Sequence, residues 1–313
     1  MTPERAMKTD PVKAIADAVL YEGYILWPYR RSALKNQRRF TFGGVYPPAH
    51  AAGHPDDPCA MQAEVLLRGE AEVGVTVRFL QVVRRTVVGP DGEPVDERVV
   101  DGELLPSWEE AIEREIAAPG PIEIAAGVER DGLEVRCWER LDGEVEVITG
   151  LTPRTGVRRV TVTVRNLSAF EAGGARPEAM KRTLCSTHIL LKATPGGAFI
   201  SLTDPPAELA DEAAACRNVG CWPVLVGEPG DAGTMLASPI ILEDYPRIAP
   251  ESPGDMFDGG EIDQLLVLNI MALTECEQAE MAASDPRAAE ILERVQRLTP
   301  EQLMTLHGRT VLR

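Results

Sequence analysis

Alternation of apolar and polar side chains at every second residue constrains this chain more than any other feature. In the run Arg159–Arg165, three valines alternate with threonine and arginine, so an extended strand there has one apolar and one polar face. Leu133–Trp138 alternates in the same way. From about Gln62 to Met271 this period recurs, and it predicts half-buried β-strands.

Turn sequences lie between such runs. Asp91-Gly92, Asp131-Gly132 and Asp142-Gly143 each supply a residue that tolerates positive backbone φ angles, which tight hairpins require. Short strands joined by hairpins are typical of antiparallel architectures. We therefore predict a mainly β (α+β) fold, an antiparallel β-sandwich or open barrel, and not a parallel nucleotide-binding sheet.

Helical patterns occur at the two ends of the chain. Asp10–Leu26 has an N-cap, a proline at the first helical position and apolar residues near helical spacing. Thr274 and Glu277 form a capping box, Asp285-Pro286 starts a second helix, and residues 299–308 have the signals of a third. We expect these short helices to pack back on the sheets.

The patterns divide the chain into three parts. Residues 1–60 hold the N-terminal helix and a basic, aromatic arm, residues 61–273 form the antiparallel β domain, and residues 274–313 form a C-terminal helical segment. With 44% apolar residues the chain has ample material for a core.

The arm stands out by its charge. No acidic residue occurs between Glu22 and Asp56, although Asp and Glu occupy 49 of the 313 positions. Residues 1–60 carry eight Lys/Arg against six Asp/Glu, whereas residues 61–313 carry 24 against 43. The basic residues of the window are Arg30, Arg31, Lys35, Arg38 and Arg39, and its aromatic residues are Tyr24, Trp27, Tyr29, Phe40, Phe42 and Tyr46.

Protein interfaces are enriched in tyrosine, tryptophan, phenylalanine and arginine, so the arm is interpreted first as a docking surface for a partner protein. A small anionic ligand is a second interpretation, and burial of the rings beneath a solvated basic rim is a third. Nucleic acid is disfavoured by the net charge of −17. The residues predicted to bind a partner are Trp27, Tyr29, Arg30, Arg31, Lys35, Arg38 and Arg39.

A metal site is the main alternative. His50, His54 and Cys59 gather two imidazoles and a thiol in ten residues, next to Asp56 and Asp57. These groups suit a zinc-like or nickel-like transition metal and would allow metal binding or metal-dependent hydrolysis. The competing interpretation is a loop with incidental polar residues.

Other functional signals are absent from the sequence. It contains no G-x-S-x-G elbow, no H-E-x-x-H, no Walker A loop and no G-x-G-x-x-G, so no catalytic residue is assigned. No targeting segment or membrane-length apolar run is visible, and we expect a cytoplasmic protein with no membrane partner and six reduced cysteines.

The segment from Glu243 to Asp263 is strongly acidic, with seven acidic residues and one base, Arg247. It is interpreted as a solvated acidic loop or, less directly, a cation site. It would also suit the basic arm, either within one chain or across a homo-oligomer, and the sequence leaves this choice open.

Three stretches carry a resemblance: AIADAVLYEGYILWPYRRSALKNQRRFTFGGVYPP, LEDYPRIAPESPGDMFDGGEIDQLLVLNIMAL and SDPRAAEIL. They resemble an uncharacterised bacterial family encoded alongside actinobacterial-type nickel-iron hydrogenase genes. The resemblance implies an accessory or assembly role, with a hydrogenase subunit or its precursor as the partner, and supplies no catalytic residue. Together with the arm it favours a cytoplasmic, non-catalytic accessory protein.

Overall fold

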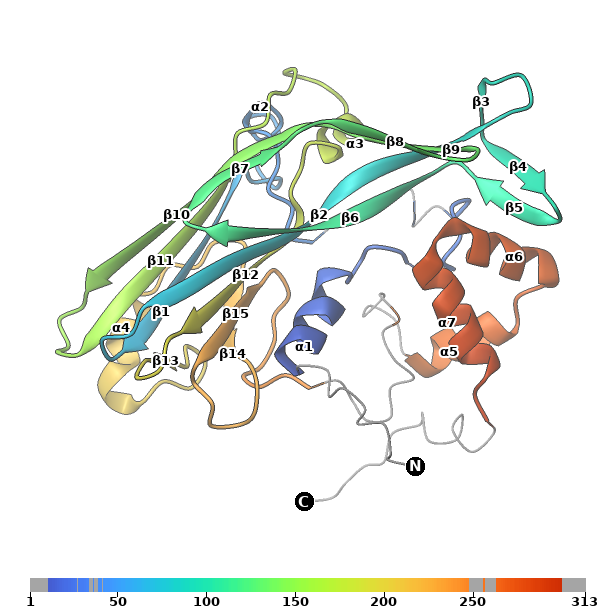
Figure 1. Cartoon of the computed structure of the whole chain (residues 1–313). Coiled ribbons are helices and arrows are strands. Elements are labelled where there is room, and N and C mark those ends of the chain that lie inside the picture. The colour runs from blue at the N-terminus through green and yellow to red at the C-terminus, as the bar shows by residue number, and fades with distance from the viewer. Residues whose placement is uncertain are drawn as a thin grey trace, which may run out of the picture.

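The computed structural model describes residues 11–26, 28–33, 36, 39–40, 42–247, 256 and 263–299 of the 313-residue chain. Two antiparallel sheets pack against each other, and helices lie beneath one of them (Figure 1). The predicted mainly β fold, an antiparallel sandwich with an N-terminal helix and short C-terminal helices, is confirmed.

The first sheet has five strands in the order β13-β1-β11-β10-β7. Every pair in it is antiparallel. Its strands are β1 (Ala60–Arg68), β7 (Gly120–Ile124), β10 (Leu141–Leu151), β11 (Val157–Asn166) and β13 (Ala198–Ile200).

The second sheet has eight strands, with the path β14-β15-β12-β2-β9-β8 and two further strands, β3 and β6, that pair with β2. A separate pair, β4 with β5, lies beyond it. The strands are β2 (Val73–Val88), β3 (Pro94–Val95), β4 (Glu97–Val100), β5 (Glu103–Pro106), β6 (Trp108–Ala118), β8 (Gly127–Asp131), β9 (Glu134–Trp138), β12 (Cys185–Ala193), β14 (Trp222–Leu225) and β15 (Thr234–Ser238).

The helices are short, and none in the described ranges has the length and apolar character needed to span a bilayer. They are α1 (Pro11–Leu20), α2 (Pro48–Ala51), α3 (Arg176–Met180), α4 (Ala210–Ala214), α5 (Asp263–Met271), α6 (Glu275–Ser284) and α7 (Pro286–Gln296), with one 3-10 turn at Ala207–Leu209.

The alternation in β11 is confirmed. Val160, Val162 and Val164 are fully buried, and the threonines between them are half-buried on the opposite face. In β9 the expected contrast between faces is missing, because all five residues are half-buried.

Two of the three predicted hairpin turns are confirmed. Gly92 lies between β2 and β3 with φ +86°, and Gly132 joins β8 to β9 with φ +56°. Asp142-Gly143 is not a turn but part of β10, where Gly143 pairs with both neighbouring strands. A Cβ atom at Gly143 would lie 2.6 Å from the carbonyl oxygen of Arg165, so this glycine permits close packing.

The helix signals near the C-terminus are also confirmed. Thr274 and Glu277 form a reciprocal capping box at α6, and the Asp285 side chain accepts a hydrogen bond from the Arg287 N–H at the start of α7. The helix predicted for residues 299–308 lies outside the described residues, apart from Thr299.

The strand pattern predicted to continue to Met271 is wrong at its end, where α5 forms. This segment is apolar on nearly every side, and such a run does not distinguish a buried strand from a helix by periodicity. The N-terminal helix is shorter than predicted, since α1 ends at Leu20 and turns follow as far as Tyr24.

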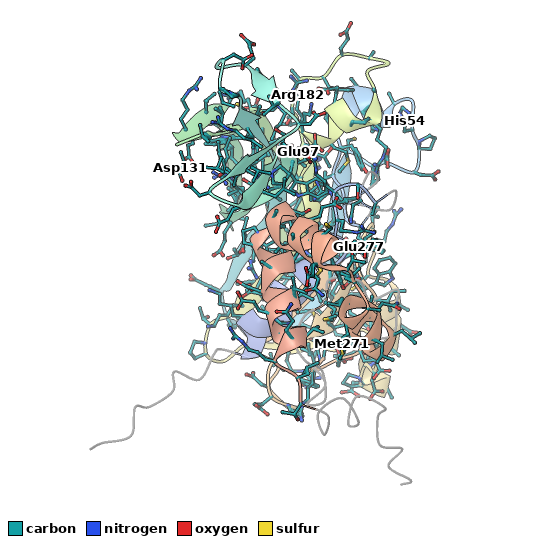
Figure 2. The ribbon with its side chains drawn as sticks, turned by 90° about the vertical axis from the view of Figure 1, so that its right-hand side faces the viewer. His54, Glu97, Asp131, Arg182, Met271 and Glu277 are labelled. Carbon is teal, nitrogen blue, oxygen red and sulfur yellow. The ribbon has the colours of Figure 1, made fainter. Side chains whose placement is uncertain are left out.

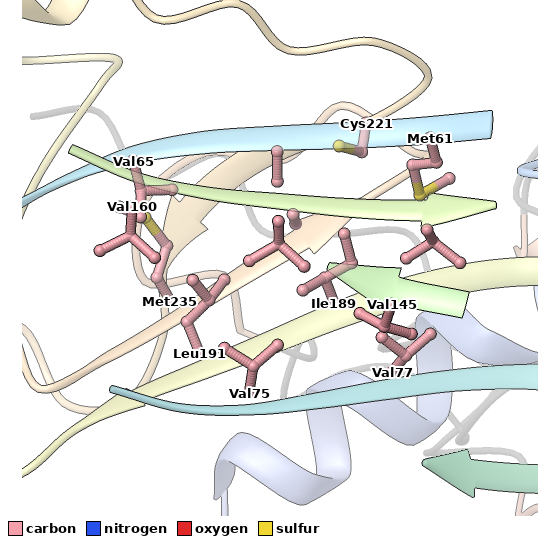
Figure 3. Close-up of a cluster of buried hydrophobic side chains, with 14 of the residues drawn as sticks. Met61, Val65, Val75, Val77, Val145, Val160, Ile189, Leu191, Cys221 and Met235 are labelled. Carbon is pink, nitrogen blue, oxygen red and sulfur yellow. The ribbon is translucent and has the colours of Figure 1, made fainter. Parts of the chain in front are cut away.

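The main core lies between the two sheets (Figure 3). Val65 and Val160 of the five-stranded sheet face Val77, Ile189 and Leu191 of the eight-stranded sheet, and all five are fully buried. This packing of apolar faces is the physical reason for the alternation along the strands.

A second core lies on the other face of the eight-stranded sheet. It joins Tyr24 and Tyr29 of the N-terminal segment, Leu80 of β2, and Ile291 and Leu292 of α7. The three parts predicted from the sequence therefore share buried contacts.

His188 provides a test of this packing. It is buried in β12, and its Nδ1 and Nε2 lie 2.7 Å from the Ser186 carbonyl oxygen and 3.2 Å from Ser238 Oγ. Burial lowers the pKa of His188 to about 4. Because the unfolded chain takes up this proton near pH 6.5, we expect stability to fall by up to about 3 kcal/mol between pH 6.5 and 4.

The measurement is urea unfolding at several pH values for the parent and His188→Gln. The variant lacks the titrating group, so its stability should fall less steeply than that of the parent over this window. Equal slopes for the two proteins would contradict the prediction.

Candidate functional site

Most described side chains of the predicted basic and aromatic arm have structural roles, either in the second core or in contacts with other parts of the chain. Tyr24, Tyr29 and Phe40 have exposed fractions of 1%, 0% and 5% and belong to the second core. Tyr29 and Phe40 both adopt φ of 58°, a left-handed conformation that bulky residues rarely take. Packing around their rings offsets that local cost.

A buried hydrogen bond fastens the arm to the C-terminal helices. The Tyr24 hydroxyl donates to Asp285 Oδ2 at 2.5 Å, and Asp285 is 1% exposed. The same hydroxyl accepts from the Ala111 N–H of β6 at 3.2 Å. Burial and the neighbouring Asp285 carboxylate raise the pKa of Tyr24, so the hydroxyl stays protonated and remains a donor.

Arg39 lies in the same layer with an exposed fraction of 5%. Its guanidinium stacks 3.9 Å from the centroid of the Trp108 ring and donates to the Glu109 carbonyl oxygen. Burial lowers the pKa of Arg39. Its charge is therefore enclosed by the protein.

Arg30 and Arg31 are nearer the surface but engaged within the chain. Arg30 Nη1 lies 3.1 Å from Glu277 Oε1 of α6, and Figure 2 shows Glu277 on the helical side of the molecule. Arg31 donates to the Asp96 carbonyl oxygen at 2.8 Å and pairs with the Glu97 carboxylate.

The open docking surface expected from the sequence is therefore not formed by Tyr29, Arg30, Arg31 and Arg39. The Tyr29 ring, predicted to lie at an interface, is buried in the core. Arg30 and Arg31 pair with carboxylates of α6 and β4. The other three predicted partner-binding residues, Trp27, Lys35 and Arg38, lie outside the described residues.

The acidic segment contacts the arm through its described residue Met256. Most of its acids, including the candidate cation ligands Asp255, Asp258 and Glu261, lie outside the described residues. Its described Met256 accepts a hydrogen bond at its carbonyl oxygen from the Tyr29 hydroxyl at 2.6 Å.

The predicted metal ligands are not brought together as a three-residue site. The rings of His50 and His54 stack with centroids 4.0 Å apart and planes 8° apart, an arrangement in which their nitrogens do not converge on one point. No group of three or more His, Cys, Asp or Glu that could hold a metal occurs in the described part of the chain. His50, His54 and Cys59 therefore do not form one ligand set in this geometry.

The two histidines have structural partners instead. His50 Nε2 lies 2.9 Å from Asp57 Oδ2, and His54 Nδ1 lies 2.9 Å from the His50 carbonyl oxygen. His50 also stacks on Tyr46, whose hydroxyl accepts from Arg176 at 2.6 Å. Figure 2 shows His54 at the upper end of the molecule, away from the C-terminal helices.

A pocket of about 260 Å³ lies beside this loop. We call it the Phe42–Trp222 pocket, after the two exposed aromatic side chains on its rim. Its lining comes from four stretches of the chain: Phe42, Gly43, Gly44, Val45 and Tyr46; Asp56, Asp57, Pro58, Ala60 and Met61; Gly220 and Trp222; and Pro239.

Close backbone packing forms the pocket wall. The Phe42 and Gly43 carbonyl oxygens accept hydrogen bonds from the Ser186 and Thr187 N–H groups at 3.2 and 2.9 Å. Gly43 has φ +57°, and a Cβ atom there would lie 2.5 Å from Pro239. Only glycine fits both the conformation and the contact.

Two exposed aromatic side chains line the opening, and two further exposed apolar residues lie close to lining residues in the chain. Phe42 and Trp222 line it with exposed fractions of 43% and 45%. Val219, adjacent to the lining residue Gly220, is 51% exposed, and Ile241, two residues after Pro239, is 72% exposed. The antiparallel pairing of β14 with β15 sets Trp222 opposite Ser238, next to the lining residue Pro239, and Val219 pairs with Gln62 of β1.

This pocket was missed from the sequence because its exposed aromatic residues, Phe42 and Trp222, lie far apart in the chain and share no motif. Gly43-Gly44 is the one local signal of close packing there. No protein-family model matches the chain, and no curated protein matches it as a relative.

The buried and outer parts of the arm should respond differently to substitution. We expect Tyr24→Phe to lower the free energy of unfolding by about 1–3 kcal/mol, since Oδ2 of the buried Asp285 loses its hydroxyl donor and keeps only the Arg287 N–H at Oδ1. Arg30→Ala removes only a partly exposed ion pair and should cost under about 1 kcal/mol. Urea unfolding checks both, and equal losses would contradict this assignment.

Substitutions of the two stacked histidines, His50 and His54, should also differ in how much they lower the free energy of unfolding. We expect His50→Ala to cost about 2–4 kcal/mol, because it removes a fully buried ring and the donor to Asp57. His54→Ala removes an exposed ring and should cost under about 1 kcal/mol. Elemental analysis after purification without chelator should give the same metal content for both variants and the parent. Loss of a stoichiometric metal in either variant would restore the metal interpretation.

Proposed function

We propose that this chain is a cytoplasmic, non-catalytic accessory protein that binds a partner protein at the Phe42–Trp222 pocket and the apolar side chains around it. The partner that the sequence resemblance indicates is a nickel-iron hydrogenase subunit or its precursor. The docking surface thus differs from the partner-binding residues that the sequence suggested, of which the described Tyr29, Arg30, Arg31 and Arg39 have partners within the chain, although Phe42 also belongs to the arm.

Exposed Phe42 and Trp222 on the lining of one pocket, with exposed Val219 and Ile241 one and two residues from the lining residues Gly220 and Pro239, carry this proposal. Single exposed apolar side chains are common on protein surfaces, but a contiguous group around a hollow is typical of interaction sites. Exposed tryptophan and phenylalanine are the residue types that supply large contact areas in interfaces. A partner side chain entering the pocket would contact the buried Val45 and Met61 at its base.

Charge favours a particular kind of partner segment. Asp56 is exposed at the pocket, whereas the Asp57 carboxylate is engaged by His50. With a net charge of −17, the whole protein attracts basic surfaces and repels acidic ones. The expected partner segment therefore combines an apolar anchor with neighbouring lysine or arginine.

The described residues give little support to a catalytic role. Ser238 Oγ lies 3.2 Å from His188 Nε2, but the two residues have exposed fractions of 0% and 1%, so a substrate has no access to them. This pair is consistent with a satisfied polar contact in the core.

The experiment is a binding titration between this protein and purified nickel-iron hydrogenase subunits, including the unprocessed precursor. Trp222→Ala combined with Ile241→Ala should raise Kd at least about 30-fold, equivalent to about 2 kcal/mol for loss of one anchor. Both side chains are substantially exposed, so folding should be unaffected.

Leu265→Ala with Leu268→Ala is the matched control, because these α5 residues are 49% and 48% exposed and lie outside the pocket. Asp56→Asn should weaken binding more at low salt than at high salt. Absence of binding to every hydrogenase subunit would remove the partner assignment. An affinity that the Trp222 and Ile241 substitutions leave unchanged would remove the site.

A further inference from the structure

One edge of β10 is unpaired over half of its length. Residues Gly143–Leu151 pair with β11 on one side, whereas β7 pairs only with Leu141–Val145 on the other. In the described part of the chain, no strand pairs with the second edge from Glu146 to Leu151. Figure 1 shows β10 continuing well past β7. Backbone N–H and C=O groups along this edge are open to another strand.

This edge lacks the usual protection against strand pairing. β6, whose one partner among the described strands is β2, carries Glu109, Glu110, Glu113 and Glu115 along its length. The β10 stretch Val147–Leu151 carries no charge. Its Ile148 and Leu151 are 54% and 90% exposed. Sheet edges that stay free are usually blunted by charges, so an uncharged apolar edge is suited to pairing.

We propose that the occupant is a second copy of this chain, with the two β10 strands pairing antiparallel about a two-fold axis at Thr149. This symmetry sets Val147 opposite Leu151 and Ile148 opposite Gly150 of the other copy. The Cβ direction of Gly150 has no atom within 4 Å, which leaves room for the Ile148 side chain. Leu151 then covers Val147, whose outer part is open in a single copy.

The charges at the two ends of the stretch are complementary under this symmetry. Glu144 and Glu146, both paired with Arg165, precede it with side chains 47% and 48% exposed, and Arg154, paired with Glu212, follows it at 54%. Antiparallel pairing brings the acidic end of each strand toward the basic end of the other. A parallel arrangement would place like charges side by side.

Pairing of this kind joins the two five-stranded sheets into one continuous sheet. The residues that form it differ from those of the Phe42–Trp222 pocket, so dimerisation and partner binding are tested separately.

The first test is sedimentation equilibrium of the full chain over a range of concentrations. We expect a concentration-dependent dimer for the parent and at least a tenfold rise in the dimer Kd for Ile148→Lys with Leu151→Lys. Val99→Lys with Val128→Lys is the matched control, since these strand residues are 65% and 63% exposed and lie outside β10. Circular dichroism establishes that each variant is folded.

The second test fixes the register. In a Cys276→Ser background, which removes the exposed native thiol, Thr149→Cys should cross-link to itself under mild oxidation. Directly opposite residues of antiparallel strands have Cα atoms about 4.5–5.5 Å apart, which suits a disulfide. Arg154→Cys, which is not opposite itself, should cross-link far less.

Three results would overturn the proposal. One is a parent chain that stays monomeric at every concentration, and another is a dimer that both lysine substitutions leave intact. The third is a monomeric parent whose binding to a hydrogenase subunit is lost in Ile148→Lys with Leu151→Lys, which would assign the edge to a different protein.

Discussion

The buried hydrogen bond between Tyr24 and Asp285 links the parts of this molecule that lie farthest apart in sequence. Asp285 is also the N-cap of α7, and Arg39 stacks on Trp108 in the same layer. A buried carboxylate requires donors, so the arm, the start of β6 and the helix terminus must be positioned together. The helical layer is consequently joined to the sheet by polar contacts within an apolar core, and this combination specifies one arrangement of the two.

The arm contains no acidic residue because it packs beside carboxylates of other elements. It runs beside Glu277 and Glu280 of α6 and reaches Glu97, so acidic residues in it would meet like charges across a partly buried contact. Its described arginines have partners within the chain, and Tyr24, Tyr29, Phe40 and Tyr46 lie in the second core. A composition that resembles an interface is thus explained by an interface between two parts of one protein.

Two other surfaces are left for partners. The Phe42–Trp222 pocket is hollow, apolar and rimmed by Asp56, which suits a mixed apolar and basic segment. The free β10 edge offers backbone groups and Ile148 and Leu151, which suits strand addition. The first proposal depends on side-chain recognition and the second on main-chain pairing, so one protein could use both at once in an assembly.

The sequence by itself determined the fold class and much of the local structure, because alternation, capping residues and Asp-Gly turns act over a few neighbouring positions. β11, the capping box at Thr274 and the start of α7 follow from such local signals. Only the tertiary structure decided the role of Gly143, the burial of Tyr29 and the assembly of the pocket. Those outcomes depend on which distant segments meet, and the same tyrosine or arginine suits a core, an internal ion pair or an external interface equally well until its neighbours are in place.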